Sequence, residues 1–155
     1  MNGVRRIVTG HRGDGLAIIT SDRVFEPLPI PSGDAAFAKL WVTQTSPADN
    51  RDERDGAGLA SGLTCADGSV LRVVDLLPGK VSPMHKTNSV DYGIVLWGEM
   101  EMRLDSGEAT RLKAGDIVVQ RGTNHAWANV GSTPARMAFV LIDALPLGDG
   151  SGVTP

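Results

Sequence analysis

The chain has 155 residues and a mass of 16.3 kDa, which is the size of one domain, residues 1–155. With 41% hydrophobic and 21% charged residues it has a globular composition, and a net charge of −3 without a basic stripe argues against nucleic acid as a partner. The single cysteine, Cys65, excludes an intrachain disulfide, and no apolar run approaches the ~18 residues of a membrane span. Because no apolar segment follows Arg5 and Arg6, no secretory signal is visible, and we expect a cytoplasmic protein.

Short apolar runs rich in Val, Ile and Leu, separated by Gly, Pro and Asn, predict many short strands. In chain order the expected strands are Arg5–Thr9, Leu16–Thr20, Phe37–Thr43, Val70–Leu77, Tyr92–Trp97, Met100–Leu104, Ile117–Gln120, His125–Asn129 and Ala135–Ile142. Strands at this spacing favour an all-β, antiparallel sandwich or barrel.

Four segments carry additional local signals. Residues 99–104 alternate polar and apolar side chains, which is typical of a strand with one solvent-facing side, and Asp105-Ser106-Gly107 after it reads as a hairpin turn. Residues 32–39 have the composition for a turn of helix. Residues 47–62 are charged and then glycine-rich, which indicates an exposed loop, and we expect the tail 148–155 to fray.

Two of the three histidines lie at corresponding places in two glycine-punctuated blocks. The first block runs from Gly79 through His85 and Asp91 to Gly98, and the second from Gly115-Asp116 to His125 and Asn129. These blocks resemble the paired motifs of the cupin superfamily. In that family the first motif reads Gly, five residues, His, one residue, His, three or four residues, Glu, six residues and Gly, and the second ends in a histidine followed four residues later by asparagine.

The resemblance covers roughly residues 70–142 and implies an antiparallel jelly-roll β-barrel, to which residues 1–46 add N-terminal strands. The chain departs from the family pattern at two metal positions. Thr87 stands where the family has its second histidine, and Asp91 stands where it has glutamate. Gln120 replaces a proline of the second motif.

Two imidazoles and one carboxylate suffice as the protein ligands of a divalent ion with open positions. His85, Asp91 and His125 are therefore the candidate metal ligands, for Zn, Fe, Mn or Ni. Asp is one methylene shorter than Glu, so its carboxylate reaches such an ion only if the backbone moves inward or a water bridges the gap.

A metal-free pocket is the alternative. In it the two histidines bind a polar or anionic ligand, and Asp91, paired with one of them, or a histidine acts as the catalytic base. A purely structural role for all three side chains is disfavoured, because burying them without a polar task is costly.

Four further residues are candidates for substrate binding. Ser89 lies in the turn between His85 and Asp91, and Thr87 could hydrogen-bond a bound water or ligand. Trp127 lies two residues after His125 and shares its inward face, where it could form an aromatic wall. Gln120 could present its amide to an anionic substrate. Tyr92, next to Asp91, is expected to point outward.

Two functions of different class follow from these features. One is a small-molecule enzyme of the lyase, decarboxylase, isomerase or dioxygenase type that the resemblance implies, acting on a small polar or carboxylate substrate, with or without a metal. The other is a non-catalytic protein that binds a metabolite without metal. Small cupins are often homodimers, and the N-terminal strands offer an edge that a second copy could cover.

Overall fold

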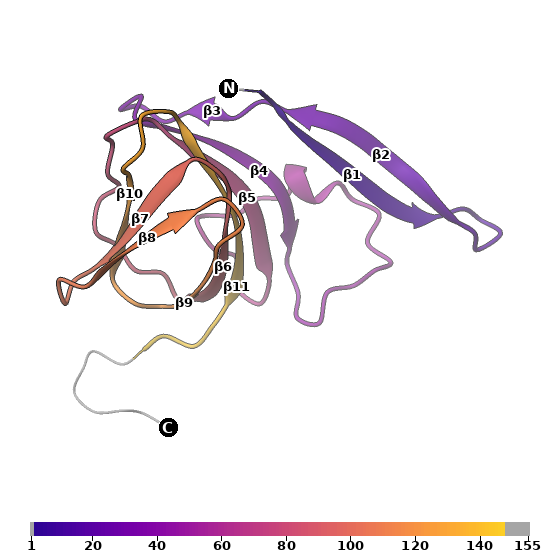
Figure 1. Cartoon of the computed structure of the whole chain (residues 1–155). Helices are drawn as coiled ribbons and strands as arrows, with labels where there is room; N and C mark the ends of the chain where they lie inside the picture. The colour runs from indigo at the N-terminus through magenta and orange to yellow at the C-terminus, as the bar shows by residue number, and fades with distance from the viewer. Residues whose placement is uncertain (1, 148–155) are drawn as a thin grey trace.

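The computed structural model describes residues 2–147, and its regular structure is almost entirely antiparallel strands (Figure 1). The tail 148–155, for which we expected fraying, lies outside the described residues. The elements are β1 (Val4–His11), β2 (Ala17–Phe25), β3 (Leu28–Pro29), β4 (Ala35–Thr43), the 3-10 turn η1 (Gly56–Gly58), β5 (Ser69–Leu76), β6 (Ser89–Trp97), β7 (Glu99–Leu104), β8 (Ala109–Lys113), β9 (Ile117–Arg121), β10 (His125–Asn129) and β11 (Ala135–Asp143).

Two sheets face each other to form the barrel. One has six strands in the order β3-β4-β5-β11-β6-β9, and the other has three in the order β10-β7-β8. The remaining strands, β1 and β2, form a separate hairpin that extends away from the barrel (Figure 1). The predicted all-β jelly roll with added N-terminal strands is thereby confirmed. Within residues 2–147 we find no helix with the length and apolar character that crossing a membrane requires.

The barrel core lies between the two sheets. Its buried side chains include Leu76 of β5, Val95 of β6, Met100 of β7, Trp127 of β10 and Met137 of β11. Each comes from an inward position of its strand, so the period of two that defines a strand also brings these side chains together. About 25 cal/mol for each Å² of apolar surface removed from water makes this packing the main stabilising term of the barrel.

The β6–β7 junction depends on one glycine. Gly98 adopts a φ of +82°, and a Cβ at that position would lie 2.6 Å from the Cα of Ala135. Only glycine combines the left-handed conformation with such a close approach of two backbones. The junction lets β6 pass directly from the six-stranded sheet to β7 of the three-stranded sheet.

A buried ion pair ties β5 to β11. The Asp75 and Arg136 side chains are almost fully buried, and Arg136 Nη2 lies 2.6 Å from Asp75 Oδ2. The same Nη2 donates to the carbonyl oxygen of Asn2 at 2.8 Å, and the guanidinium lies 4.1 Å from the ring centre of Trp97. This pair lies among residues that the strands already bring into register, since Arg136 is the direct partner of Asp75.

One local expectation is wrong. The helical turn predicted within residues 32–39 is absent, and Ala35 begins strand β4. The alanines favour a helix locally, but pairing with β5, in the register Ala35 to Leu76, overrides that preference. Residues 47–62 do form an exposed connection, with η1 as its only regular element, and Asp55 in it is held by the buried Arg6 of β1 at 2.5 Å.

Candidate functional site

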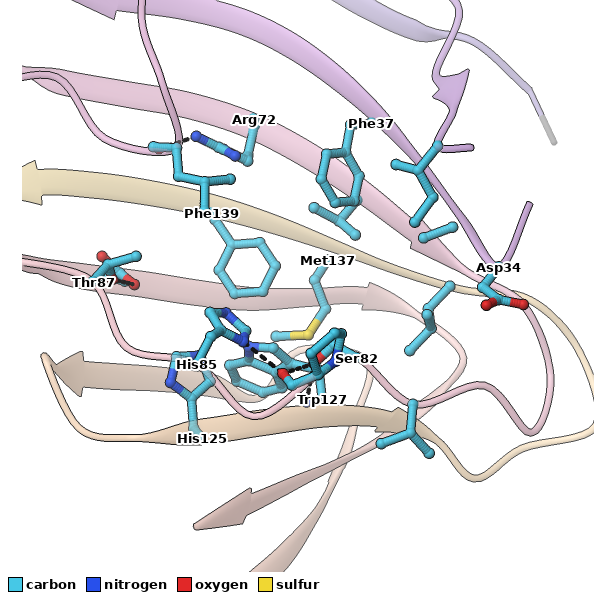
Figure 2. A pocket seen from close by; sticks show the side chains of 18 of the residues that line it. Asp34, Phe37, Arg72, Ser82, His85, Thr87, His125, Trp127, Met137 and Phe139 are labelled. Carbon is cyan, nitrogen blue, oxygen red and sulfur yellow. Dashed lines mark hydrogen bonds between the residues drawn. The ribbon is translucent and has the colours of Figure 1, made fainter. Parts of the chain in front are cut away.

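A cavity of about 390 Å³ opens inside the barrel, and its walls are mainly apolar (Figure 2). The aromatic and sulfur-containing lining side chains are Phe37, Met100, Trp127, Met137 and Phe139. The Trp127 and Phe139 rings meet edge to face, with centroids 5.4 Å apart, and the Trp127 ring also meets His125 at 5.5 Å. The polar lining residues are few, and they are Ser32, Asp34, Arg72, Ser82, His85, Thr87, Asp91 and His125.

His85 and His125 lie side by side at this cavity, with ring centroids 4.4 Å apart and planes inclined at 49°. A short antiparallel bridge places them there. The backbone N–H of His85 donates to the carbonyl of His125 at 2.8 Å, and the reverse bond measures 2.9 Å. The segment before β6 thus pairs with β10, and residues 40 positions apart in sequence become direct neighbours.

Both rings are held by the main chain in the same way. His85 Nδ1 lies 2.8 Å from the carbonyl oxygen of Pro83, and His125 Nδ1 lies 2.9 Å from that of Thr123. Because a carbonyl oxygen only accepts hydrogen bonds, each Nδ1 must carry the hydrogen, and in the neutral ring Nε2 keeps its lone pair. The arrangement leaves two basic Nε2 atoms without a partner fixed by the main chain.

Asp91 is buried beside the cavity and is bound by hydroxyl groups. Ser89 Oγ donates to Asp91 Oδ1 at 2.5 Å, and Thr87 Oγ1 lies 3.5 Å from Oδ2. Burial raises the pKa of the Asp91 carboxyl, although the Ser89 hydrogen bond and the charge of His125 oppose the shift. Burial also lowers the pKa of the His125 imidazole, against the hydrogen bond to Thr123.

The structure does not assemble the expected metal ligands. Among residues 2–147, no three His, Cys, Asp or Glu side chains come close enough to hold a metal ion. The two imidazoles meet, but the shorter aspartate carboxylate is engaged by Ser89 rather than joining them. His85, Asp91 and His125 therefore do not fit a metal as a three-ligand set, because catalytic zinc needs three protein ligands.

The four expected substrate-binding residues divide into two pairs. Thr87 and Trp127 line the cavity, Trp127 as its spacing from His125 predicts. Ser89 and Gln120 are buried but do not line it. Ser89 binds Asp91, and the Gln120 amide donates to the carbonyl of Thr123 at 3.1 Å, the same carbonyl that receives His125 Nδ1. Tyr92 is exposed, as expected.

Sequence reasoning missed two charged lining residues, Asp34, which pairs with Lys80 at 2.8 Å, and Arg72 of β5. A signal was present in the alternation of that strand. Arg72, Val74 and Leu76 share one face and all three line the cavity. A charged residue on an otherwise apolar strand face marks either a buried ion pair or a binding site.

Comparison with known proteins shows which family this barrel belongs to. A family profile described as Cupin domain matches residues 72–142, which hold both histidine blocks. Phomopsin biosynthesis cluster protein C' of Diaporthe leptostromiformis is 43% identical over 150 residues, covering 92% of this chain and 79% of the relative. The chain belongs to the cupin family.

Other cupins agree with this assignment. The cupin-domain-containing oxidoreductase fogC of Aspergillus ruber is 37% identical over 150 residues, which cover 92% of this cupin and 74% of that protein. The solved cupin domain of Schizosaccharomyces pombe Cnp3 superposes with a TM-score of 0.54 over 90% of this cupin and 87% of that chain. At 14% identity, the latter likeness concerns the fold alone.

Proposed function

We propose that this cupin is a small-molecule enzyme that moves a proton on a largely apolar substrate held in the barrel. One observation carries the proposal, namely that two imidazoles line an apolar cavity side by side and that, among residues 2–147, neither Nε2 has a hydrogen-bond partner. A proton acceptor held at a fixed position next to a bound substrate is the requirement of general acid–base catalysis.

The chemistry within reach of these residues is an isomerisation. The neutral His125 takes a proton from a substrate carbon that lies between a carbonyl and a carbon–carbon double bond. The C–H electron pair forms a new carbon–carbon double bond and the carbonyl π pair moves onto oxygen, which gives a dienolate. The histidine pair returns the proton to the far carbon of the original double bond as the carbonyl re-forms, so the double bond shifts and no oxidant or reductant is consumed. Asp91 supports this cycle, because its negative charge favours the protonated form of His125.

The comparisons support a small organic substrate. The Diaporthe relative is named for a biosynthesis cluster, and the Aspergillus relative is named an oxidoreductase. A Zn, Fe, Mn or Ni ion held by three protein ligands would need one more beside the two histidines, and among residues 2–147 no His, Cys, Asp or Glu side chain comes close enough to supply it. Proton transfer is thus the step that these residues support by themselves, and an apolar body suits the walls better than the small polar substrate expected from the sequence.

Deuterium incorporation tests this proposal. The protein is incubated in heavy water with a panel of aryl-substituted enones and ketones, and exchange at carbon is followed by mass spectrometry. We expect exchange that falls by about 100-fold in His85→Ala and His125→Ala. The third histidine, exposed His11 of β1, provides the matched control, and His11→Ala should keep full exchange. Exchange that survives in both site variants would refute the role of the pair.

Two further measurements separate the alternatives. Elemental analysis after dialysis should find far less than one Zn, Fe, Mn or Ni ion per chain, and a stoichiometric ion that is lost in His85→Ala would overturn the metal-independent reaction. A panel compound that binds tightly but never exchanges would identify a non-catalytic binding protein instead.

We also propose that the cupin forms a homodimer. Supporting this, the β1–β2 hairpin leaves Ile19 63% and Val24 62% exposed, and β9 at the edge of the large sheet leaves Ile117 66% and Val119 59% exposed. A two-stranded hairpin with little covering is marginally stable in water, so a second copy is the natural cover. Light scattering should give twice the chain mass, and Ile117→Lys combined with Val24→Lys should return it to the monomer value.

A further inference from the structure

Arg72 is a half-buried cation that lines the apolar cavity, and among residues 2–147 no carboxylate forms a salt bridge with it. Burial lowers the pKa of its guanidinium, and the charge of Asp91, which lines the same cavity, only partly opposes that shift. Its Nη2 donates to the carbonyl oxygens of Gly62, at 3.4 Å, and Leu63. Its Nε is fully buried and makes no hydrogen bond. Within residues 2–147, no Asp or Glu oxygen lies within salt-bridge distance of this guanidinium, whereas the buried Arg136, on the opposite face of the same sheet, is paired with Asp75.

A partly buried cation without a salt bridge is costly. Taking a charged group out of water without a counter-ion costs several kcal/mol, and proteins avoid it or pair the charge. Asp91, which lines the same cavity, is committed to the Ser89 hydroxyl. The part of the guanidinium that lines the cavity, rather than the fully enclosed Nε, is therefore the donor available to a group that enters from outside.

The surroundings of Arg72 define what can reach it. Arg72 extends from β5 on the wall opposite the histidine pair, and the Phe139 ring lies between the two (Figure 2). Leu63, whose carbonyl Arg72 holds, adds an apolar side chain to the same end of the cavity. A ligand that spans the cavity thus meets a cation at one end, apolar and aromatic walls along its body, and two imidazoles at the other end.

We propose that the substrate is an amphiphilic organic acid whose carboxylate pairs with Arg72 while its apolar body packs against Phe139 and Trp127. This inference rests on the proposed function and names the substrate class for the same cavity. Arg72 is a binding and specificity-determining residue, since it lies on the wall opposite the histidines that carry the proton. Its planar guanidinium matches the two oxygens of a carboxylate.

A matched pair of probes tests the charge requirement. We choose 2-naphthylacetate and its neutral amide, 2-naphthylacetamide, which share the aromatic body and differ in charge. Titration calorimetry with the whole chain should give a dissociation constant at least about 10-fold lower for the acetate, which corresponds to about 1.4 kcal/mol. In Arg72→Met the preference should disappear because the acetate weakens, and in Arg72→Lys part of it should remain.

A control variant and a spectroscopic readout separate binding from folding. Arg111→Met removes an exposed arginine of β8 and should leave the preference unchanged. The side-chain Nε–H resonance of Arg72, assigned by its loss in Arg72→Lys, should shift on adding acetate and not on adding amide. Because the ratio of the two dissociation constants is compared within each variant, a general loosening of the Gly62–Leu63 segment affects both probes and cancels.

The outcomes are distinct. Equal binding of acetate and amide by the unaltered protein, or an acetate preference that persists in Arg72→Met, overturns the role of Arg72 and leaves the proton-transfer proposal standing. Failure of both probes to bind at millimolar concentration overturns the carboxylate proposal together with the assignment of the cavity as an aromatic-ligand site. An acetate preference that requires Arg72, while heavy-water exchange is absent, supports the binding inference and refutes the proposed reaction.

Discussion

Replacing Asn129 by alanine should destabilise the barrel by about 3 kcal/mol. The Asn129 side chain is 2% exposed and makes three hydrogen bonds, to the carbonyls of Leu76 and Thr133 at 2.8 Å each and from the N–H of Gly131 at 2.9 Å. At about 1 kcal/mol for each bond, their loss sums to roughly 3 kcal/mol. For a chain of this size such a loss lowers Tm by roughly 6–12 °C.

Thermal and urea unfolding, followed by circular dichroism, measure this effect. Asn129→Asp should be at least as destabilising, because its second oxygen would face the carbonyls of Leu76 and Thr133 instead of donating to them. Asn124→Ala provides the control, since the Asn124 side chain makes one exposed bond of 3.2 Å to Asp105 and its loss should stay within about 0.5 kcal/mol. A loss below about 1 kcal/mol in Asn129→Ala would refute the idea that this side chain fastens β10 to β5.

Three further predictions concern buried charge. Burial raises the pKa of Asp91, so as pH rises above the ordinary 3.8 this carboxyl ionises more readily in the unfolded chain, and the folded state loses stability. Asp91→Asn should therefore raise Tm near neutral pH and should not raise it below pH 3.8. A lower Tm near neutrality would contradict this. Burial lowers the pKa of His125, so as pH falls below the ordinary 6.5 this imidazole takes up its proton more readily in the unfolded state, and Tm should decline. His125→Gln should flatten this decline. Identical curves of Tm against pH for the unaltered protein and His125→Gln would argue against it. Asp75→Asn leaves the buried Arg136 without its counter-charge and should lower the free energy of unfolding, measured in urea, by about 3–5 kcal/mol. An unchanged free energy of unfolding would be inconsistent with this.

The sequence predicts most strands of the barrel well because one face of each is buried, whereas β2 is almost wholly exposed and the expected strand Leu16–Thr20 covers only its first part. Residues 99–104 alternate strictly, and β7 follows that alternation. The short β3 and β8 escaped prediction. Two paired residues are too few to show a period, and residues 109–113 are mostly exposed, so no apolar face marks them. The helical turn expected within 32–39 failed for the opposite reason, since pairing with β5 outweighed a local preference.

The position of the candidate site could be predicted from the sequence, but the hydrogen-bond partners of its side chains could not. The matching histidine spacings brought His85 and His125 to one place, as expected. Which side chain Asp91 would bind depends on the backbone path before β6, which no spacing encodes, and Ser89 turned out to be its partner. Arg72 was missed because the alternation of β5 puts it on the face of Val74 and Leu76 without saying whether that face lines a cavity. Only the assembled walls show that it does, and that no salt bridge to Arg72 forms among residues 2–147.

Residues 59–63, in the second half of the connection between β4 and β5, are held by hydrogen bonds to their backbone carbonyls. Lys39 Nζ holds the carbonyl of Leu59 at 2.6 Å, Gln44 Nε2 holds that of Ala60 at 3.3 Å, and Arg72 holds those of Gly62 and Leu63. Every residue type offers the same backbone carbonyl, so side chains in this stretch can be substituted without losing these hydrogen bonds. Substitution libraries confined to residues 59–63 should therefore change the shape of the cavity near Leu63 and its ligand selectivity, while the geometry of the His85–His125 pair stays the same.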